Sequence, residues 1–410
     1  MDNLGSPATI YVRLRFVSFF NFLLTGDFLR CRSVTEPANV LIVANSEDDA
    51  NMLYALGMLA ADPFVFFRVD GKCHAVVNDL ELDRARKKVP HCRVISYSQC
   101  LERLHRLRIK RPGMAAVINL LLREQNLRKI FVPPNFPFGL ARDLRQYKIK
   151  VRVKKGGLFP EREFKRADEL KKISAAIMMA EVGLSEGIQA LKSSKIAKDG
   201  KLIYHGVPLT SEKLRSIIDV SILQAGGRPG HTIVACGRQS CDPHEQGHGV
   251  LRGHQPIILD VFPRSHKTGY FGDVTRTVVR GKATEAVRRL YDAVWHAQEI
   301  GLAKVRADVP ALEIHAAVRN YFETQGFKTC RKNGHLIGFF HGTGHGVGLE
   351  VHEPPRITHN SIDILKPGHV LTIEPGLYYP ELGGVRLEDV ACVTGNGPRN
   401  LTKFEKVFEV

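Results

Sequence analysis

The stretch GTGHGVGLEVHEPP, residues 342–355, decides how the rest of this sequence is interpreted. It holds two histidines, His345 and His352, together with four glycines. A glycine on each side of a histidine allows other backbone segments and a bound ligand to come close, because glycine has no Cβ and tolerates positive φ. The run lacks the G-x-G-x-x-G spacing of a dinucleotide-binding loop. A metal site is therefore the prediction that this stretch favours.

Four acidic residues in the same half of the chain lie in short motifs that can supply further ligands. Asp260 follows an apolar run, and the other three lie in GYFGDVTRT (Asp273), TIEPGLY (Glu374) and GGVRLED (Glu388). Any one of them alone is more simply a strand-end or turn residue. These four carboxylates and the His345 imidazole together form a set of mainly oxygen ligands. Such a set favours a pair of hard or borderline ions such as Mn²⁺, Co²⁺ or Fe²⁺ over a thiolate zinc site. Two such ions can activate water and polarise a carbonyl.

Taken together, these motifs resemble the pita-bread metallopeptidases of the M24 type, in the branch of the Xaa-Pro aminopeptidases and prolidases. The resemblance covers residues 230–390. It implies an α/β amino-terminal domain followed by an α+β catalytic domain of the pita-bread (creatinase/aminopeptidase) fold, with two similar halves around a dimetal cleft. It also implies two divalent ions, which we expect to be Mn²⁺, with Co²⁺, Fe²⁺ or Zn²⁺ as alternatives. The implied ligands are Asp260, Asp273, His345, Glu374 and Glu388.

The same resemblance implies roles for residues around the metals. Glu374 would pass a proton from the attacking water to the leaving nitrogen, and His352 would steady the tetrahedral intermediate. In CDPH, residues 241–244, His244 would contact the reacting carbonyl. The nearby His248 is an alternative, but the proline before His244 restricts its backbone and matches the family pattern. The remaining residues would line the substrate cleft: His341, Arg386 and, as a weaker candidate, Tyr378.

Hydrophobic periodicity predicts two domains and an amino-terminal extension. Over residues 37–157, strands at 40–44, 64–67, 75–77 and 129–132 alternate with helices at 48–60 and 115–121, which is typical of a mixed α/β domain. Residues 160–410 would form the catalytic domain, with amphipathic helices at 163–192, 284–304 and 309–324. We expect residues 1–36 to have no export role: their apolar core at 16–24 lacks a small-residue cleavage site and is too short to span a bilayer.

One spacing departs from the commoner family pattern. The interval from Asp260 to Asp273 is thirteen residues, which is longer than usual. We expect both residues at strand positions and the extra residues in a longer hairpin loop at 263–268, so that the two carboxylates can still meet.

Composition limits the partners and the compartment. The eight cysteines form no C-x-x-C pair, which indicates reduced thiols in a cytoplasmic protein. The net charge of +17 is concentrated in basic runs such as residues 142–155. Apart from the single Tyr147, these runs carry no interleaved aromatic residues, and they contain no nucleic-acid-binding motif, so we expect solvated surface, with no specific nucleic acid and no membrane as partner. The resemblance implies a homo-oligomer, most simply a dimer.

The predicted reaction is hydrolysis of the Xaa-Pro bond at the amino terminus of peptides whose second residue is proline. Two alternatives stay open. A prolidase would accept Xaa-Pro dipeptides alone, and motif spacing does not separate it from the aminopeptidase. A non-catalytic pita-bread protein would bind a peptide or another partner, but such relatives usually lose metal ligands, and all five are present here.

Overall fold

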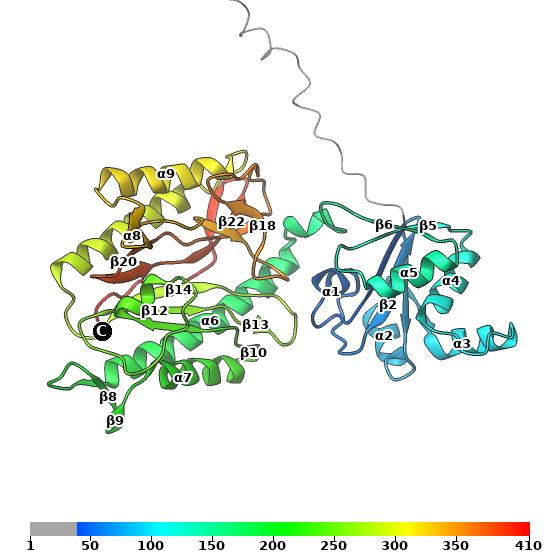
Figure 1. Ribbon diagram of the computed structural model, residues 1–410, viewed down its shortest axis with the longest axis horizontal. Coiled ribbons are helices and arrows are strands. Elements are labelled where there is room, and N and C mark those ends of the chain that lie inside the picture. The colour runs from blue at the N-terminus through cyan, green and yellow to red at the C-terminus, as the bar shows by residue number, and fades with distance from the viewer. Residues whose placement is uncertain (1–38) are drawn as a thin grey trace, which may run out of the picture. The chain divides into compact units, whose positions relative to one another are not determined.

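The computed structural model describes residues 39–410, so the predicted extension at residues 1–36 lies outside the described residues. The described residues form two parts (Figure 1): the first is built on one six-stranded sheet, and the second contains several smaller sheets. Among residues 39–410, no helix combines the length and the apolar composition that crossing a bilayer requires.

The first part is a mixed α/β sheet with strand order β4-β3-β2-β1-β5-β6. Alternate residues of its central strand enter different cores: Leu41 packs with one apolar cluster, and Val40 and Ile42 pack with another. Such alternation buries both faces of the sheet, as expected when helices cover them. Its strands are β1 (Asn39–Ala44), β2 (Phe64–Val69), β3 (Lys72–Val77), β4 (Cys92–Ser96), β5 (Lys129–Val132) and β6 (Lys150–Val153). Its helices are α1 (Ala50–Leu56), α2 (Leu82–Lys88), α3 (Tyr97–Arg106), α4 (Met114–Glu124) and α5 (Phe138–Gln146).

The second part contains two halves, each with a helix pair followed by a sheet. In the first half α6 packs against α7, and the sheet has the order β11-β12-β14. Its elements are η1 (Pro160–Glu163), α6 (Ala167–Ser193), β7 (Lys195–Ile196), β8 (Leu202–Tyr204), β9 (Val207–Pro208), α7 (Ser211–Gln224), β10 (Gly227–Arg228), β11 (Ile233–Cys236), η2 (Gly237–Cys241), β12 (Pro256–Val261), β13 (Arg264–Ser265) and β14 (Val274–Val279).

In the second half α8 packs against α9, and the main sheet has the order β18-β17-β19-β22-β23. Figure 1 shows α6 and α7 on one side of the strands and α8 and α9 on the other. The predicted arrangement of two helix-plus-sheet halves is confirmed. The elements are α8 (Glu285–Ala303), α9 (Ala311–Thr324), β15 (Cys330–Lys332), β16 (His335–Ile337), β17 (Gly344–Gly346), β18 (Glu353–Ile357), β19 (Val370–Ile373), β20 (Gly376–Tyr379), β21 (Gly383–Arg386), β22 (Asp389–Thr394) and β23 (Gly397–Asn400).

Several predicted boundaries were wrong for local reasons. The helix predicted at 48–60 is shorter: the Asp49 side chain accepts a hydrogen bond from the Met52 amide at its start, and Gly57 ends it with φ of 69°. The helix predicted from residue 163 begins at Ala167, because residues 160–163 form a separate 3₁₀ turn led by Pro160. The predicted long connection is confirmed, because residues 262–273 join the antiparallel neighbours β12 and β14. The prediction of a simple loop at 263–268 is wrong, because β13 within it pairs with β10.

Candidate metal centre

The five predicted ligands come from five different segments of the second part. Asp260 lies within β12 and His345 within β17. The other three lie one residue outside a strand: Asp273 precedes β14, Glu374 follows β19, and Glu388 precedes β22. The expectation that both aspartates occupy strand positions is therefore wrong for Asp273. A carboxylate at a strand end is still held by the ladder next to it and can turn toward its neighbours.

The structure brings these side chains together. His345 Nε2 lies 3.8 Å from Asp273 Oδ2 and 3.4 Å from Glu374 Oε1. One ligand atom each from Asp273, His345 and Glu388 fall within 4.8 Å of one another. Asp260 Oδ1 and Glu388 Oε1 are buried without a hydrogen-bond partner. Buried carboxylate oxygens without donors are costly, and bound cations would satisfy them. The residues present therefore fit the ions that the sequence predicts.

The electrostatic repulsion among the buried carboxylates also favours bound cations. Burial, followed by repulsion from Glu388, raises the pKa of Asp273 and of Glu374 well above the ordinary carboxyl value. Burial, followed by repulsion from Asp260, raises the pKa of Glu388 to about 7. Burial is the main cause that lowers the pKa of His345 to about 3, and the charge of the neighbouring His352 is the second cause. The imidazole therefore stays neutral, as a metal ligand requires. Divalent cations would relieve the repulsion among these carboxylates.

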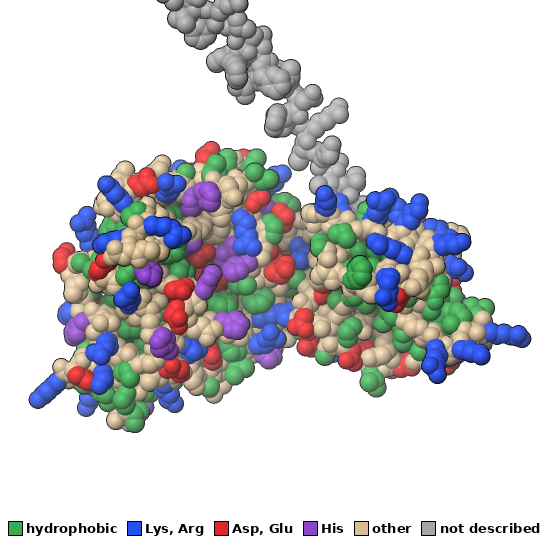
Figure 2. All heavy atoms as spheres, in the orientation of Figure 1, with side chains coloured by type: hydrophobic (Ala, Val, Ile, Leu, Met, Phe, Trp, Pro, Cys, Tyr) green, Lys and Arg blue, Asp and Glu red, His purple; other side chains and the backbone are tan. Residues whose placement is uncertain are grey.

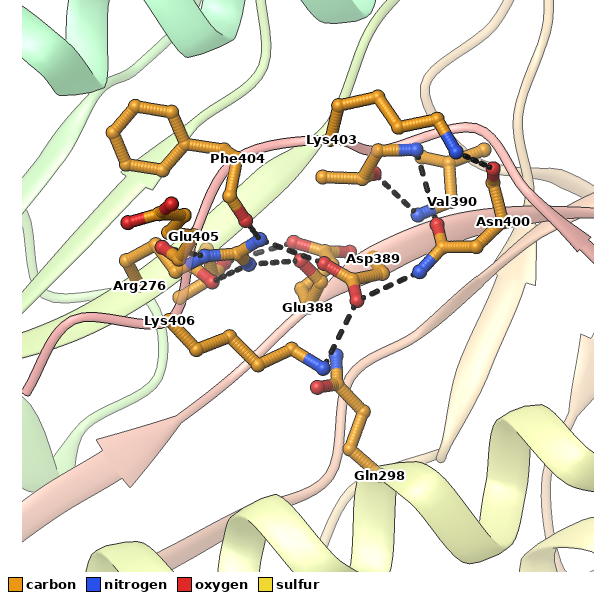
Figure 3. A network of polar contacts seen from close by, with 12 residues as sticks. Arg276, Gln298, Glu388, Asp389, Val390, Asn400, Lys403, Phe404, Glu405 and Lys406 are labelled. Carbon is orange, nitrogen blue, oxygen red and sulfur yellow. Dashed lines mark hydrogen bonds and ion pairs between the residues drawn. The ribbon is translucent and has the colours of Figure 1, made fainter.

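Behind the carboxylates, a buried arginine fixes the segment that carries Glu388 (Figure 3). The Arg276 guanidinium donates to the Glu388 carbonyl at 2.7 Å, to Asp389 Oδ1 at 2.8 Å and to the Phe404 carbonyl at 2.6 Å. The Thr275 hydroxyl donates to Glu388 Oε2 at 2.8 Å. One side chain therefore ties β14, the start of β22 and the carboxy-terminal segment together next to the ligands.

The five predicted ligands line a cavity of about 810 Å³. The space-filling view in Figure 2 shows histidine and acidic side chains gathered on one face of this part of the molecule. Imidazole and guanidinium groups can hold a peptide carbonyl or carboxylate by hydrogen bonds. Those that line the cavity, besides the predicted ligand His345, are His231, His244, His341, His352, Arg356 and Arg386.

Three predicted substrate-cleft residues form one chain of contacts that begins at the predicted ligand Asp260. Arg386 donates to Asp260 Oδ2 at 2.7 Å and to the Tyr378 hydroxyl at 3.0 Å, and the Tyr378 oxygen lies 2.8 Å from His341 Nε2. Burial, followed by the Arg386 charge, lowers the pKa of His341 to about 3. Tyr378 is fully buried and does not line the cavity, so it can reach a substrate only through its neighbours.

The remaining predicted residues are the two histidines expected near the reacting carbonyl. The His352 ring lies edge-on to the ring of His345, with 4.3 Å between centroids, and both His352 and His244 line the cavity. His248, the alternative to His244, is exposed, lies 3.6 Å from a Glu245 oxygen and does not line the cavity. The geometry therefore favours His244 of the two, while its role stays a prediction.

Sequence reasoning missed several residues at this site, among them His231, which lines the cavity. Arg356 lines the cavity and stands four residues after His352, directly behind the quoted motif. His315 lies on α9 and contacts Thr343 inside that motif. The spacing of Arg356 from His352 was a signal that could have been used, whereas nothing around His315 in the sequence sets it apart from other helical histidines.

Comparison with known proteins decides the family. The description "Metallopeptidase family M24" matches residues 171–395, which is more than half of the chain. This chain belongs to that family. It is therefore a metallo-hydrolase, and the predicted branch and pita-bread fold are confirmed.

Individual relatives agree with this assignment. The chain is 31% identical over 252 residues to the uncharacterized peptidase YqhT of Bacillus subtilis, covering 57% of this chain and 69% of that protein. It is 28% identical over 298 residues to the Xaa-Pro dipeptidase of Pyrococcus horikoshii, covering 69% of this chain and 75% of that protein.

Solved structures show the same fold. The prolidase of Pyrococcus furiosus matches with a TM-score of 0.72 at 24% identity, over 90% of this chain and 97% of that one. The X-Pro aminopeptidase of Thermotoga maritima matches with a TM-score of 0.76 at 21% identity, over 91% of this chain and 97% of that one.

Replacing Gly344 by alanine is expected to disturb the centre. A Cβ at this position would lie 1.9 Å from the Thr372 carbonyl oxygen, so β17 would have to move away from β19 and take His345 with it. Overpacking of this kind costs about 1–3 kcal/mol. Urea unfolding should show that loss, and equilibrium dialysis should show weaker Mn²⁺ binding. Gly395→Ala is the control, because an added Cβ at Gly395 meets nothing within 4 Å. Equal stability and equal Mn²⁺ affinity in Gly344→Ala and Gly395→Ala would contradict this expectation.

Proposed function

We propose that this protein is an aminopeptidase that hydrolyses the Xaa-Pro bond at the amino terminus of peptides longer than two residues. The Xaa-Pro dipeptidases and the X-Pro aminopeptidase among its relatives support a proline-directed peptidase. The observation that favours the aminopeptidase over the dipeptidase is the size of the substrate space.

A second recess adjoins the active-site cavity. This recess has a volume of about 390 Å³ and shares Pro243 and Phe340 with the main cavity of about 810 Å³. Cavities of about 300–1,000 Å³ hold ligands much larger than a dipeptide. A peptide that extends beyond proline therefore has room in this cleft, which supports a substrate of three or more residues.

Asp260, Asp273, His345, Glu374 and Glu388 would hold two divalent ions, most simply Mn²⁺, with Co²⁺, Fe²⁺ or Zn²⁺ as alternatives. When bound, such ions polarise the scissile carbonyl and lower the pKa of water. Glu374 would take a proton from the attacking water and deliver it to the proline nitrogen. His352 and His244 would donate hydrogen bonds to the developing oxyanion, a contribution that is often the largest in such reactions. His341 and Arg386 would orient the peptide.

A dipeptidase is the second candidate, and Arg356 is the observation that favours it. Its guanidinium lines the cavity and donates to the His352 carbonyl at 3.4 Å, and within residues 39–410 it forms no ion pair with a carboxylate. A cation in this position could bind the carboxylate that follows proline in a Xaa-Pro dipeptide.

Comparison of Ala-Pro with Ala-Pro-Ala separates the two candidates. For the purified, Mn²⁺-loaded protein we expect kcat/KM for the tripeptide to exceed that for the dipeptide by about tenfold or more, because the tripeptide makes extra contacts worth about 1.4 kcal/mol or more. Replacing Arg356 by methionine should then change both values by a similar factor.

The opposite outcome would assign the protein to the dipeptidases: turnover of Ala-Pro alone, with a large rise in KM after Arg356→Met. A protein that binds Mn²⁺ but cleaves neither peptide would revive the non-catalytic reading.

The remaining assignments follow from the same proposal. We propose a creatinase-type amino-terminal domain at residues 37–157, a catalytic domain at residues 160–410 and an extension of uncertain role at residues 1–36. The substrate is a peptide with proline at its second position. We further propose a cytoplasmic homodimer without specific nucleic acid or membrane partners.

A further inference from the structure

Thr343 occupies the centre of the segment that carries the metal-binding histidine. It is fully buried, and it stands two residues from His341 on one side and two residues from His345 on the other, between Gly342 and Gly344. Flanking glycines leave a backbone with more freedom than other residues allow. The contacts of Thr343 therefore have a large share in holding this segment in one conformation.

The backbone of Thr343 connects two strands that lead to the metal centre. Its amide donates to the Ile357 carbonyl at 2.7 Å, and its carbonyl accepts from the Glu374 amide at 2.8 Å. The second of these bonds joins the histidine segment directly to the backbone of a predicted ligand. A displacement of Thr343 would therefore move Glu374 as well as His345.

The side chain of Thr343 is held by a histidine from a helix outside the predicted site. His315 on α9 places its Nδ1 3.0 Å from Thr343 Oγ1, and its ring lies 5.3 Å from the Phe339 ring. Burial, followed by the neighbouring His359, lowers the pKa of His315 to about 4. The imidazole is therefore neutral at ordinary pH and can make this contact without a buried charge.

We propose that His315 is a positioning residue for the metal centre: through Thr343 it fixes the segment that carries His345 and the backbone of Glu374. His315 does not line the cavity, so it would act on the ligands and not on the substrate. The inference rests on the proposed metal site. Groups behind metal ligands commonly change metal affinity or activity by about 10–100-fold when they are removed.

Four variants test the contact from both sides. His315→Asn keeps a polar atom near the position of Nδ1, whereas His315→Leu removes it. Thr343→Ser keeps the hydroxyl, whereas Thr343→Val removes it with little change in shape. The measurements are the Mn²⁺ dissociation constant, from the electron paramagnetic resonance signal of free Mn²⁺, and kcat and KM for Ala-Pro-Ala at saturating Mn²⁺.

We expect His315→Leu and Thr343→Val to weaken Mn²⁺ binding by about tenfold or more and to lower kcat, with KM changed less than threefold. His315→Asn and Thr343→Ser should lie within about threefold of the unchanged protein. The double variant His315→Leu/Thr343→Val should be no worse than either single change, because both remove one interaction.

His369→Leu is the matched control for loss of a buried histidine. His369 is also buried, burial also lowers its pKa to about 4, and it stacks on Phe164 away from the cavity. The His369→Leu variant should have a lower free energy of unfolding but an unchanged Mn²⁺ affinity.

Three results would overturn the proposal: equal Mn²⁺ affinity in the His315→Leu and unchanged proteins, equal losses in the His315 and His369 variants, or additive losses in the double variant. Because Mn²⁺ binding is measured without substrate, a failure of the proposed peptidase activity alone would leave this test intact.

Discussion

Replacing His345 by alanine is expected to abolish peptide hydrolysis and to lower the bound metal content of the purified protein. His345 supplies the imidazole among the five predicted ligands, and its Nε2 lies within 4 Å of oxygens from both Asp273 and Glu374. Stabilisation by bound metal ions is worth several kcal/mol, and each 1.36 kcal/mol is a factor of ten in rate, so kcat/KM should fall by about a thousandfold or more. Elemental analysis together with turnover of Ala-Pro-Ala measures both effects.

His248→Ala is the control for this change. His248 is an exposed histidine of the other half of the same part of the chain, outside the cavity, and its loss should leave metal content and kcat/KM within about twofold, as for most surface substitutions. If His345→Ala kept its metal and its turnover, the ligand set itself would be wrong. If it kept metal but lost turnover, His345 would act on the substrate and not on the ions.

The ligand set could be proposed from the sequence because each member lies in a short motif whose residues serve the same local purpose. Gly344 and Gly346 flank His345 because the neighbouring backbones come too close for a Cβ, and that requirement is visible in the sequence. Glu374 and Glu388 follow or precede buried apolar strands, which makes them acidic residues in unusual positions. The distances between the five could not be predicted, because they depend on how five segments pair within two separate sheets.

What could not be predicted depends on contacts between residues far apart in the chain. His315 reaches Thr343 across 28 residues, and Arg276 reaches Asp389 across 113. Neither partner carries a local signal, because a histidine on an amphipathic helix and an arginine in a strand are both ordinary. The α/β class of the first part was predictable from alternating strands and helices, and the pita-bread class of the second part from the resemblance of its motifs. Helix ends were misplaced where a cap or a 3₁₀ turn overrode the apolar period, as at Asp49 and Pro160.

Replacing Arg276 by methionine is expected to lower the free energy of unfolding by about 3–5 kcal/mol, because each buried acceptor that loses its donor costs about 1–3 kcal/mol. The Arg276 side chain is 1% exposed and that of Asp389 2%, so water cannot take the place of the guanidinium. Lys406 and Asn400 still contact Asp389 Oδ2, but Oδ1 and the carbonyls of Glu388 and Phe404 would lose their donor (Figure 3). Urea unfolding monitored by circular dichroism gives the change directly.

Arg319→Met provides the comparison for loss of an arginine in an exposed pair. Arg319 lies 2.9 Å from Glu323 with side chains 55% and 46% exposed, and such pairs contribute less than about 1 kcal/mol. A loss at Arg276 no larger than the loss at Arg319 would mean that the network adds little to the fold. Because Arg276 also donates to the carbonyl of Glu388, its loss should weaken Mn²⁺ binding. The Arg319 variant should bind Mn²⁺ as before, and this difference separates an effect on the ligand-bearing segment from a general loss of charge.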